Sequence, residues 1–243
     1  MDGRKTISTS ALNSALSDED TPAIAIFDLD YTLTRRGTWW RFVWSWWVWP
    51  RPYLWLPFLI AAGWAQLRYK FGLLPRDQVK LAMMRWAMKG ASKEQVYRKG
   101  EAFARREVQK GLRDGAFKAI QHHKCRGDKL IIISAAVDVI AKPMGNLLGF
   151  DHVLSTAMSF DRRNKLQLKF KTPNCYSYEK VNRFKEMLVD NPSLKQYYTH
   201  VTFYSDSYSD LAMFKLANVC VCVHPDKKLS HYAAQRGWHI LYW

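Results

Sequence analysis

Cysteine is scarce in this sequence, and no hydrophobic stretch opens it. Of its 243 residues four are cysteine, and no two of them form a CxxC pair: Cys125, Cys175, Cys220 and Cys222. This usage is typical of small buried residues in a reducing compartment and indicates no disulfide framework. Residues 1–22 mix Ser, Thr, Asp and Glu without an apolar run. They predict a mobile cytoplasmic tail and not an ordinary signal peptide.

Acidic residues are few in one long internal segment. Between Arg35 and Arg126 the sequence holds 20 Lys and Arg against 5 Asp and Glu, whereas the rest of the chain holds 17 against 16. Almost all of the formal net charge of +16 therefore belongs to this segment. We expect the segment to attract an anionic surface, such as lipid headgroups or nucleic acid. The hydrophobic content of 48% indicates a globular chain with room for one core and an inserted subdomain.

Short apolar runs alternate with helical patterns, which predicts an α/β fold with a Rossmann-like parallel sheet. Four runs have the length of buried strands: 23–27, 130–134, 201–205 and 219–223. A weaker alternation over 156–170, interrupted at 161–164, predicts a β-hairpin. Helices are expected to begin at Pro75, after the capping-box pair Ser92 and Gln95, and near Tyr178.

The strand alternation stops between residues 35 and 115. We predict that this segment is an α-helical cap, inserted into an α/β core made of residues 23–34 and 116–243. In the helix that follows Pro75, Val79, Met83 and Trp86 share one face, and Lys80 and Lys89 are expected on the opposite face. The His122–His123 pair is assigned to a solvated helix end.

Two carboxylates follow the first strand directly. Asp28 and Asp30 lie in the run FDLDYTLT, with Thr32 two residues further on. One such carboxylate can attack phosphorus while the other gives a proton to the leaving oxygen and later takes one from water. An oxygen-rich site of this kind also suits Mg²⁺. Alone, this motif is as typical of a polar turn at a strand end as it is of a catalytic site.

Three further groups lie at strand or helix ends. Ser134 ends the second core strand, where its hydroxyl is placed to hold a phosphate oxygen. Lys180 lies near the start of a helix, where its ammonium and the helix dipole both favour an anion. Asp206 and Asp210, in YSDSYSD, have the spacing of a metal ligand and the partner that orients it. Their occurrence together, in this order, favours a phosphate-handling site over chance.

These motifs resemble those of the haloacid dehalogenase superfamily, in the branch that contains phosphoserine phosphatase and phosphatidylglycerophosphatase C. The likeness runs from about residue 23 to the C-terminus and is loose in the cap. It implies a phosphoric monoester hydrolase with Asp28 as nucleophile and Asp30 as general acid and base. It also implies Mg²⁺ bound by the carboxylates of Asp28 and Asp206 and the carbonyl of Asp30, with Asp210 in support. Ser134 and Lys180 would bind the transferred phosphoryl group.

The sequence departs from the usual family pattern at two positions. Tyr31 occupies a position that is often Gly, and Ser205 precedes Asp206 where Gly is common. Neither departure removes a catalytic group. Both are expected to narrow the pocket and so to affect the fit of the substrate.

The predicted cap begins with an unusual concentration of tryptophan. Eight of the eleven tryptophans fall between Trp39 and Trp64. From Pro52 to Leu67 no residue is charged, but these 16 residues include Pro57 and are too few for an ordinary membrane span of about 20 residues. We interpret the segment as an interfacial or shallowly re-entrant hairpin on anionic lipid. The alternative is that the aromatics form the core of the cap.

Three hypotheses follow. The first is a peripheral enzyme on the cytoplasmic face of a membrane, acting on a lipid phosphate such as phosphatidylglycerophosphate, phosphatidic acid or lysophosphatidic acid. The second keeps the enzyme and makes the substrate a small soluble phosphomonoester such as phosphoserine. The third is a protein that binds a membrane or nucleic acid and does no chemistry. The third has no need for Asp28, Asp30, Lys180 and Asp206 together, and nucleic acid is therefore not expected as a partner.

Overall fold

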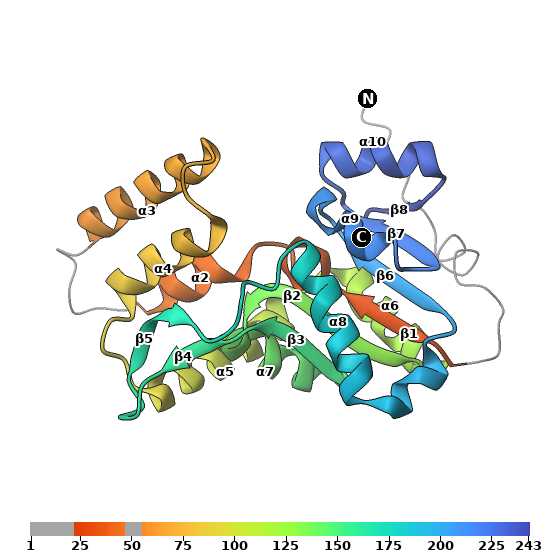
Figure 1. Ribbon diagram of the computed structural model, residues 1–243, viewed down its shortest axis with the longest axis horizontal. Coiled ribbons are helices and arrows are strands. Elements are labelled where there is room, and N and C mark those ends of the chain that lie inside the picture. Colours follow the sequence, from red (N-terminus) through yellow and green to blue (C-terminus); the bar gives the residue numbers. More distant parts are fainter. Residues whose placement is uncertain (1–21, 47–54) are drawn as a thin grey trace.

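The fold is described from a computed structural model, which describes residues 22–46 and 55–243 (Figure 1). The predicted N-terminal tail, apart from its last residue, lies outside the described residues. So does the middle of the tryptophan-rich segment, and the hairpin predicted there.

Six parallel strands form the central sheet. In sheet order they are β3 (His152–Thr156), β2 (Lys129–Val137), β1 (Ile24–Phe27), β6 (Val201–Ser205), β7 (Val219–Val223) and β8 (His239–Leu241). All four predicted strands are confirmed, and β3 and β8 are the two that the pattern analysis missed. Both lie at the edges of the sheet, where part of each strand is exposed and the apolar signal is weak. Every residue of the central strand β1 is buried.

Helices cover both faces of the sheet, which gives three layers. Helices α6 (Asp114–Cys125) and α7 (Asp138–Leu148) bury apolar side chains with the face that carries Ala25 and Phe27. Helices α8 (Tyr178–Asp190), α9 (Leu211–Phe214) and α10 (Lys227–Arg236) pack on the face that carries Ile24 and Ile26. The chain is therefore an α/β fold with a Rossmann-like core, as predicted.

A helical region is inserted after β1. It comprises α2 (Thr38–Ser45), α3 (Trp55–Lys70), α4 (Arg76–Ala87) and α5 (Lys93–Lys110). A β-bridge joins Thr34 to Leu112, where the chain leaves the core and returns to it. The capping box of Ser92 and Gln95 opens α5 as expected. The exact domain boundaries at residues 34 and 115 stay a prediction.

Helix α5 and the hairpin bind the inserted region to the core. Gly100 of α5 lies so close to α7 that an added Cβ would come within 2.1 Å of the carbonyl oxygen of Val139. The predicted hairpin is present as β4 (Met158–Phe160) and β5 (Leu166–Phe170), and its turn reaches α5 through a bond from the Lys93 N–H to the Asn164 carbonyl. These contacts hold the cap region beside the carboxyl end of β2.

The predicted faces of α4 are partly wrong. Val79 and Met83 are buried as expected, but Trp86 is 38% exposed and Lys80 is almost fully buried. The Lys80 ammonium donates to the carbonyl oxygen of Ala135 and, at 3.1 Å, to Asn174 Oδ1. Lys80 is buried because α4 lies against the end of β2 at this position, whereas Gln78 and Arg85 of the same helix are exposed.

Four further expectations need correction. His123 is buried, and its ring nitrogens lie 2.6 Å from Asp128 Oδ2 and 2.9 Å from the Tyr204 hydroxyl. The pair His122–His123 is therefore not a solvated helix end, because the end of α6 packs on the sheet. Cys125 is exposed, whereas the other three cysteines are buried.

The other two corrections concern β2 and the aromatic cluster. Strand β2 runs past Ser134 to Val137, with irregular pairing after Ile133. Trp39, Phe42 and Phe58 lie in the core, whereas Trp40, Trp44 and Trp64 are exposed. The alternative, that the aromatics form the core of the cap, therefore holds for the first three side chains, whereas docking of this segment on lipid stays a prediction.

Candidate active site

The sequence-predicted site residues converge at the carboxyl edge of the sheet. Phe27 pairs with Ile132 on one side and with Tyr204 on the other, so the residues that follow these three positions lie at one edge. Asp28 follows β1, Ser134 lies in β2 next along the edge, and Asp206 follows β6. Ligands of open α/β sheets bind at this edge.

Lys180 joins two of the predicted carboxylates. Its Nζ lies 2.8 Å from Asp28 Oδ1 and 2.7 Å from Asp210 Oδ2, and all three side chains are buried. Burial lowers the pKa of Lys180, but the charges of Asp210 and Asp28 raise it more, so the ammonium stays charged. Burial raises the pKa of Asp28 to about 6, with Lys180 lowering it and Asp210 raising it.

Ser205 holds Asp210 in place. The fully buried Ser205 hydroxyl donates to Asp210 Oδ2 at 2.6 Å. The expectation that this serine narrows the pocket is therefore wrong, since it orients a carboxylate beneath the site. Oδ1 of Asp210 is buried without a hydrogen-bond partner among the described residues.

The site disfavours the charged form of Asp206. Burial, Asp28 and Asp210 together raise the pKa of Asp206 to about 8, and Lys180 offsets only part of this. Thr32 donates to Asp206 Oδ1 at 3.3 Å, which gives the predicted supporting residue a partner. Nearby, the Arg113 guanidinium donates to the Tyr31 carbonyl at 2.9 Å. The sequence analysis did not identify Arg113, because no local pattern marks it.

Asp30 links the site to the cap. Its Oδ1 accepts a hydrogen bond of 2.8 Å from the backbone N–H of Thr38, the first residue of α2. Between them Tyr31 adopts a left-handed backbone with φ of 63°, which explains why glycine suits this position. The Tyr31 side chain is exposed and lines the same hollow as Asp30, as its predicted effect on the pocket requires.

Ser134 lies on the neighbouring strand and is buried. Its Oγ accepts a bond of 3.3 Å from the N–H of Ala136. Ser134 thus lies within β2, three residues before the strand ends, and its role in binding phosphate stays a prediction.

The site fits a hard divalent cation. The carboxylates of Asp28 and Asp210 are buried and that of Asp206 is half-buried, and a single ammonium lies among them. Burial first, and repulsion between the carboxylates second, raise the pKa values of Asp28 and Asp206, and a bound cation would offset both effects. No group of three or more His, Cys, Asp and Glu side chains with metal-binding geometry exists within the described residues. A cation here would therefore take two carboxylates and complete its shell with carbonyl and water oxygens, which is typical of Mg²⁺.

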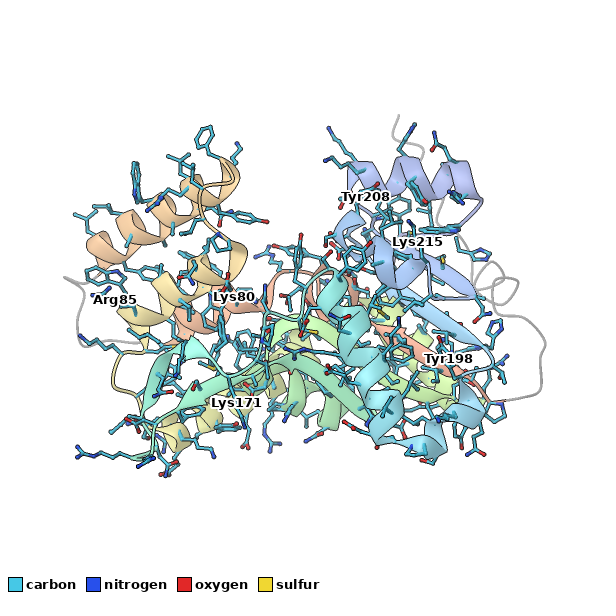
Figure 2. The ribbon with its side chains drawn as sticks, viewed as in Figure 1. Lys80, Arg85, Lys171, Tyr198, Tyr208 and Lys215 are labelled. Atoms are coloured by element: carbon cyan, nitrogen blue, oxygen red, sulfur yellow. The ribbon has the colours of Figure 1, made fainter. Side chains whose placement is uncertain are left out.

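A cavity of about 830 Å³ connects these residues to the cap. It lies between the sheet edge and helices α2, α3 and α4, and its lining includes Asp30, Tyr31, Arg36, Lys80 and Ser207. Figure 2 shows Lys80 between the cap helices and the core. The sequence analysis missed Lys80, because its place in the cavity depends on how α4 packs on β2.

The known proteins that this chain resembles agree with the geometry. The pattern of the haloacid dehalogenase-like hydrolase family matches residues 25–215, and the chain belongs to that family. It is 27% identical to the histidinol-phosphatase of Neisseria meningitidis over 122 residues, which are 50% of this chain and 55% of that protein. The chain therefore matches only about half of that relative.

Two solved structures share the fold. A protein of unknown function from Bordetella pertussis superposes with a TM-score of 0.72 at 21% identity, over 91% of this chain and 98% of that one. A substrate-bound phosphoserine phosphatase superposes with a TM-score of 0.62 at 16% identity, over 92% and 94%. At these identities the likeness shows the fold.

Proposed function

We propose that this hydrolase cleaves phosphate monoesters through a phosphorylated Asp28. The observation that carries the proposal is the buried ammonium of Lys180 between Asp28 and Asp210, at the edge of the sheet where ligands bind. Lys180 holds Oδ1 of Asp28, and we assign the attack to Oδ2. The family to which the chain belongs, and its likeness to a phosphoserine phosphatase, support the same chemistry.

The reaction would proceed in two displacements. Asp28 attacks phosphorus, the bond from phosphorus to the ester oxygen breaks, and Asp30 protonates the departing alcohol. Water then attacks the aspartyl phosphate, Asp30 accepts its proton, and the bond between Asp28 and phosphorus breaks to release inorganic phosphate. The bond from the Thr38 N–H orients Asp30 for both proton transfers.

Positive charge would balance the phosphate in each step. Ser134 and Lys180 are proposed to bind the phosphoryl oxygens. Mg²⁺, when bound by Asp28, Asp206 and the carbonyl of Asp30, would neutralise charge on those oxygens. Asp210, which Ser205 and Lys180 hold in place, would support this metal site from below.

For the substrate we favour a small soluble phosphomonoester. The similarity to phosphoserine and histidinol phosphatases supports this class, with phosphoserine and histidinol phosphate as first candidates. Lys80 and Arg36 line the cavity beyond Asp30, so the leaving group would meet cations there.

A lipid phosphate is the second candidate. The exposed apolar side chains of α3 favour it, since that helix also lines the cavity through Gln66 and Tyr69. A lipid headgroup such as that of phosphatidylglycerophosphate or phosphatidic acid would then be reached from a peripheral position on a membrane. In the part of the chain that the structure describes, no helix has the length and apolarity to cross a bilayer.

Phosphate release in Mg²⁺ from a panel of soluble and lipid phosphomonoesters tests the proposal. We expect turnover of at least one soluble ester, and none by Asp28→Asn. Turnover of lipids alone would favour the second candidate. Phosphate release that survives in Asp28→Asn would overturn the mechanism.

A further inference from the structure

A second hollow lies on the cap, between α3 and α4. Its volume is about 710 Å³, and its lining shares no residue with that of the cavity at the catalytic edge. Two indoles and three cations line it above an apolar floor: Trp64, Trp86, Arg68, Arg85, Lys89, and among others Ala61, Ala65, Leu74 and Leu81. None of the described residues that line it is acidic. Figure 2 shows Arg85 at the outer end of α4.

The outer side of α3 is apolar as well. Leu56, Ile60, Trp64, Leu67 and Phe71 follow one another at spacings of three and four residues, so they form one stripe along the helix. Each of these side chains is between 45% and 69% exposed. A helix of a soluble monomer normally turns such a stripe inward, and a contiguous exposed one marks an interaction surface.

The inward side of α3 already has its partner. Phe58, Ala62 and Ala65 are buried in the core of the molecule, and Phe58 stacks on Trp40 of α2. The exposed stripe is therefore not the packing face of a displaced helix. It is a second apolar face on a helix that is anchored by its first.

The charge around this surface has one sign. From Tyr31 to Arg76 the sequence contains no Asp or Glu. Arg68 and Lys70 lie in the last turn of α3, and Arg85 and Lys89 face them from α4 and the turn after it, all four exposed. A partner that binds this surface must therefore offer both an apolar region and a high density of negative charge.

We propose that the α3–α4 surface, meaning the stripe of α3 and the hollow beside it, docks on bilayers that contain anionic phospholipid. The aliphatic and aromatic side chains of the stripe would enter the acyl boundary, Trp64 and Trp86 would lie at headgroup level, and Arg68, Arg85 and Lys89 would bind lipid phosphates. A symmetric dimer through this face would bring like charges together. Nucleic acid has no apolar phase to cover leucine and isoleucine.

This docking site is distinct from the substrate cavity and holds for a soluble or a lipid substrate. Because α3 contributes to both, a docked molecule would have its cavity close to the membrane surface. Vesicle binding is measured without substrate, so its failure would leave the proposed hydrolysis untouched. Loss of hydrolysis would equally leave the docking site untouched.

The test is co-sedimentation of the full chain with vesicles of phosphatidylcholine alone, or mixed with phosphatidylglycerol at roughly three to one. We expect binding to the mixed vesicles and little to the neutral ones. Arg85→Gln with Lys89→Gln should weaken this binding about 25-fold, because each cation near an anionic membrane contributes about a fivefold factor. Ile60→Ser with Phe71→Ser should weaken it at least as much.

Matched variants serve as controls. Lys227→Gln with Lys228→Gln, on exposed positions of α10, and Leu147→Ser with Val189→Ser change charge and apolarity elsewhere on the surface. These variants should bind as the wild type does, and thermal melts should show all four double variants folded. Equal loss in the α10 variant would mean unspecific charge attraction and overturn the proposal. So would absence of binding to mixed vesicles, or a wild-type dimer that Ile60→Ser with Phe71→Ser dissolves.

Discussion

Replacing Lys180 with methionine is the sharpest test of how the site is held together. The substitution keeps the length of an apolar stem and removes the ammonium that lies 2.8 Å from Asp28 and 2.7 Å from Asp210. Two buried carboxylates would then face each other without the cation between them. Breaking a buried ion pair from one side costs about 3–5 kcal/mol. We expect Lys180→Met to lower the free energy of unfolding by about that amount.

The assay is urea denaturation followed by tryptophan fluorescence, with a chelator present in every sample. Lys185→Met is the matched control, because Lys185 lies on the same helix and is exposed. It should change the free energy of unfolding by less than about 0.5 kcal/mol. Since a domain of this kind is stable by about 5–15 kcal/mol, Lys180→Met should still fold enough to be measured.

A second variant separates charge from packing. Lys180→Met combined with Asp210→Asn removes one of the two opposed carboxylates. The double variant should therefore be more stable than Lys180→Met alone, with a coupling of about 1 kcal/mol or more. Additive effects, or a Lys180→Met variant within about 1 kcal/mol of the wild type, would refute the argument that this ammonium neutralises the site.

Three more predictions follow from the described contacts. Burial raises the pKa of Asp128, but the hydrogen bonds from His123 and the Ala23 N–H lower it more, so the net pKa lies below its ordinary value. The ionised Asp128 therefore contributes its full stability above about pH 4, and this stability is lost as pH falls through the lowered pKa. In thermal melts Asp128→Asn should have a lower Tm than the wild type at neutral pH, and the two Tm values should converge in strong acid. Lys80→Met should raise the KM for anionic soluble esters about tenfold with a smaller effect on kcat, whereas Lys118→Met, at an exposed position of α6, should alter neither. Chelation of divalent cations should stop phosphate release, and added Mg²⁺ should restore it. Full activity in chelator would contradict the proposal that the carboxylates of the site bind a divalent cation.

Local signals were enough to predict the four inner strands of the sheet and the carboxylates that follow two of them. Asp28 and Asp206 each follow a short apolar run, and parallel strands bring such ends to one edge of the sheet. The helix start before Lys180 placed an ammonium near an expected phosphate, and the structure adds that it bridges Asp28 and Asp210. The register of β1 and β6, which pairs Phe27 with Tyr204, brings the ends of the two strands level.

Contacts between distant segments could not be predicted in this way. Lys80 reads as a polar-face residue of α4, and only the packing of α4 on β2 buries its ammonium beside Ala135. The sequence pattern places His123 at the polar end of a helix, but in the structure Asp128 and Tyr204 enclose its ring. Ala135 for Lys80 and Tyr204 for His123 are both far away in the sequence, outside the window in which a helical or strand pattern is recognised.

Capture of the phosphorylated enzyme shows directly whether Asp28 is the nucleophile. The wild type is mixed with a turned-over phosphomonoester and Mg²⁺, quenched in acid within the first turnovers, digested, and analysed by mass spectrometry. We expect one phosphoryl group on the peptide that contains Asp28, and none in Asp28→Asn or in wild type without substrate. A phosphoryl group on another residue, or turnover by Asp28→Asn without any phosphorylated peptide, would contradict it.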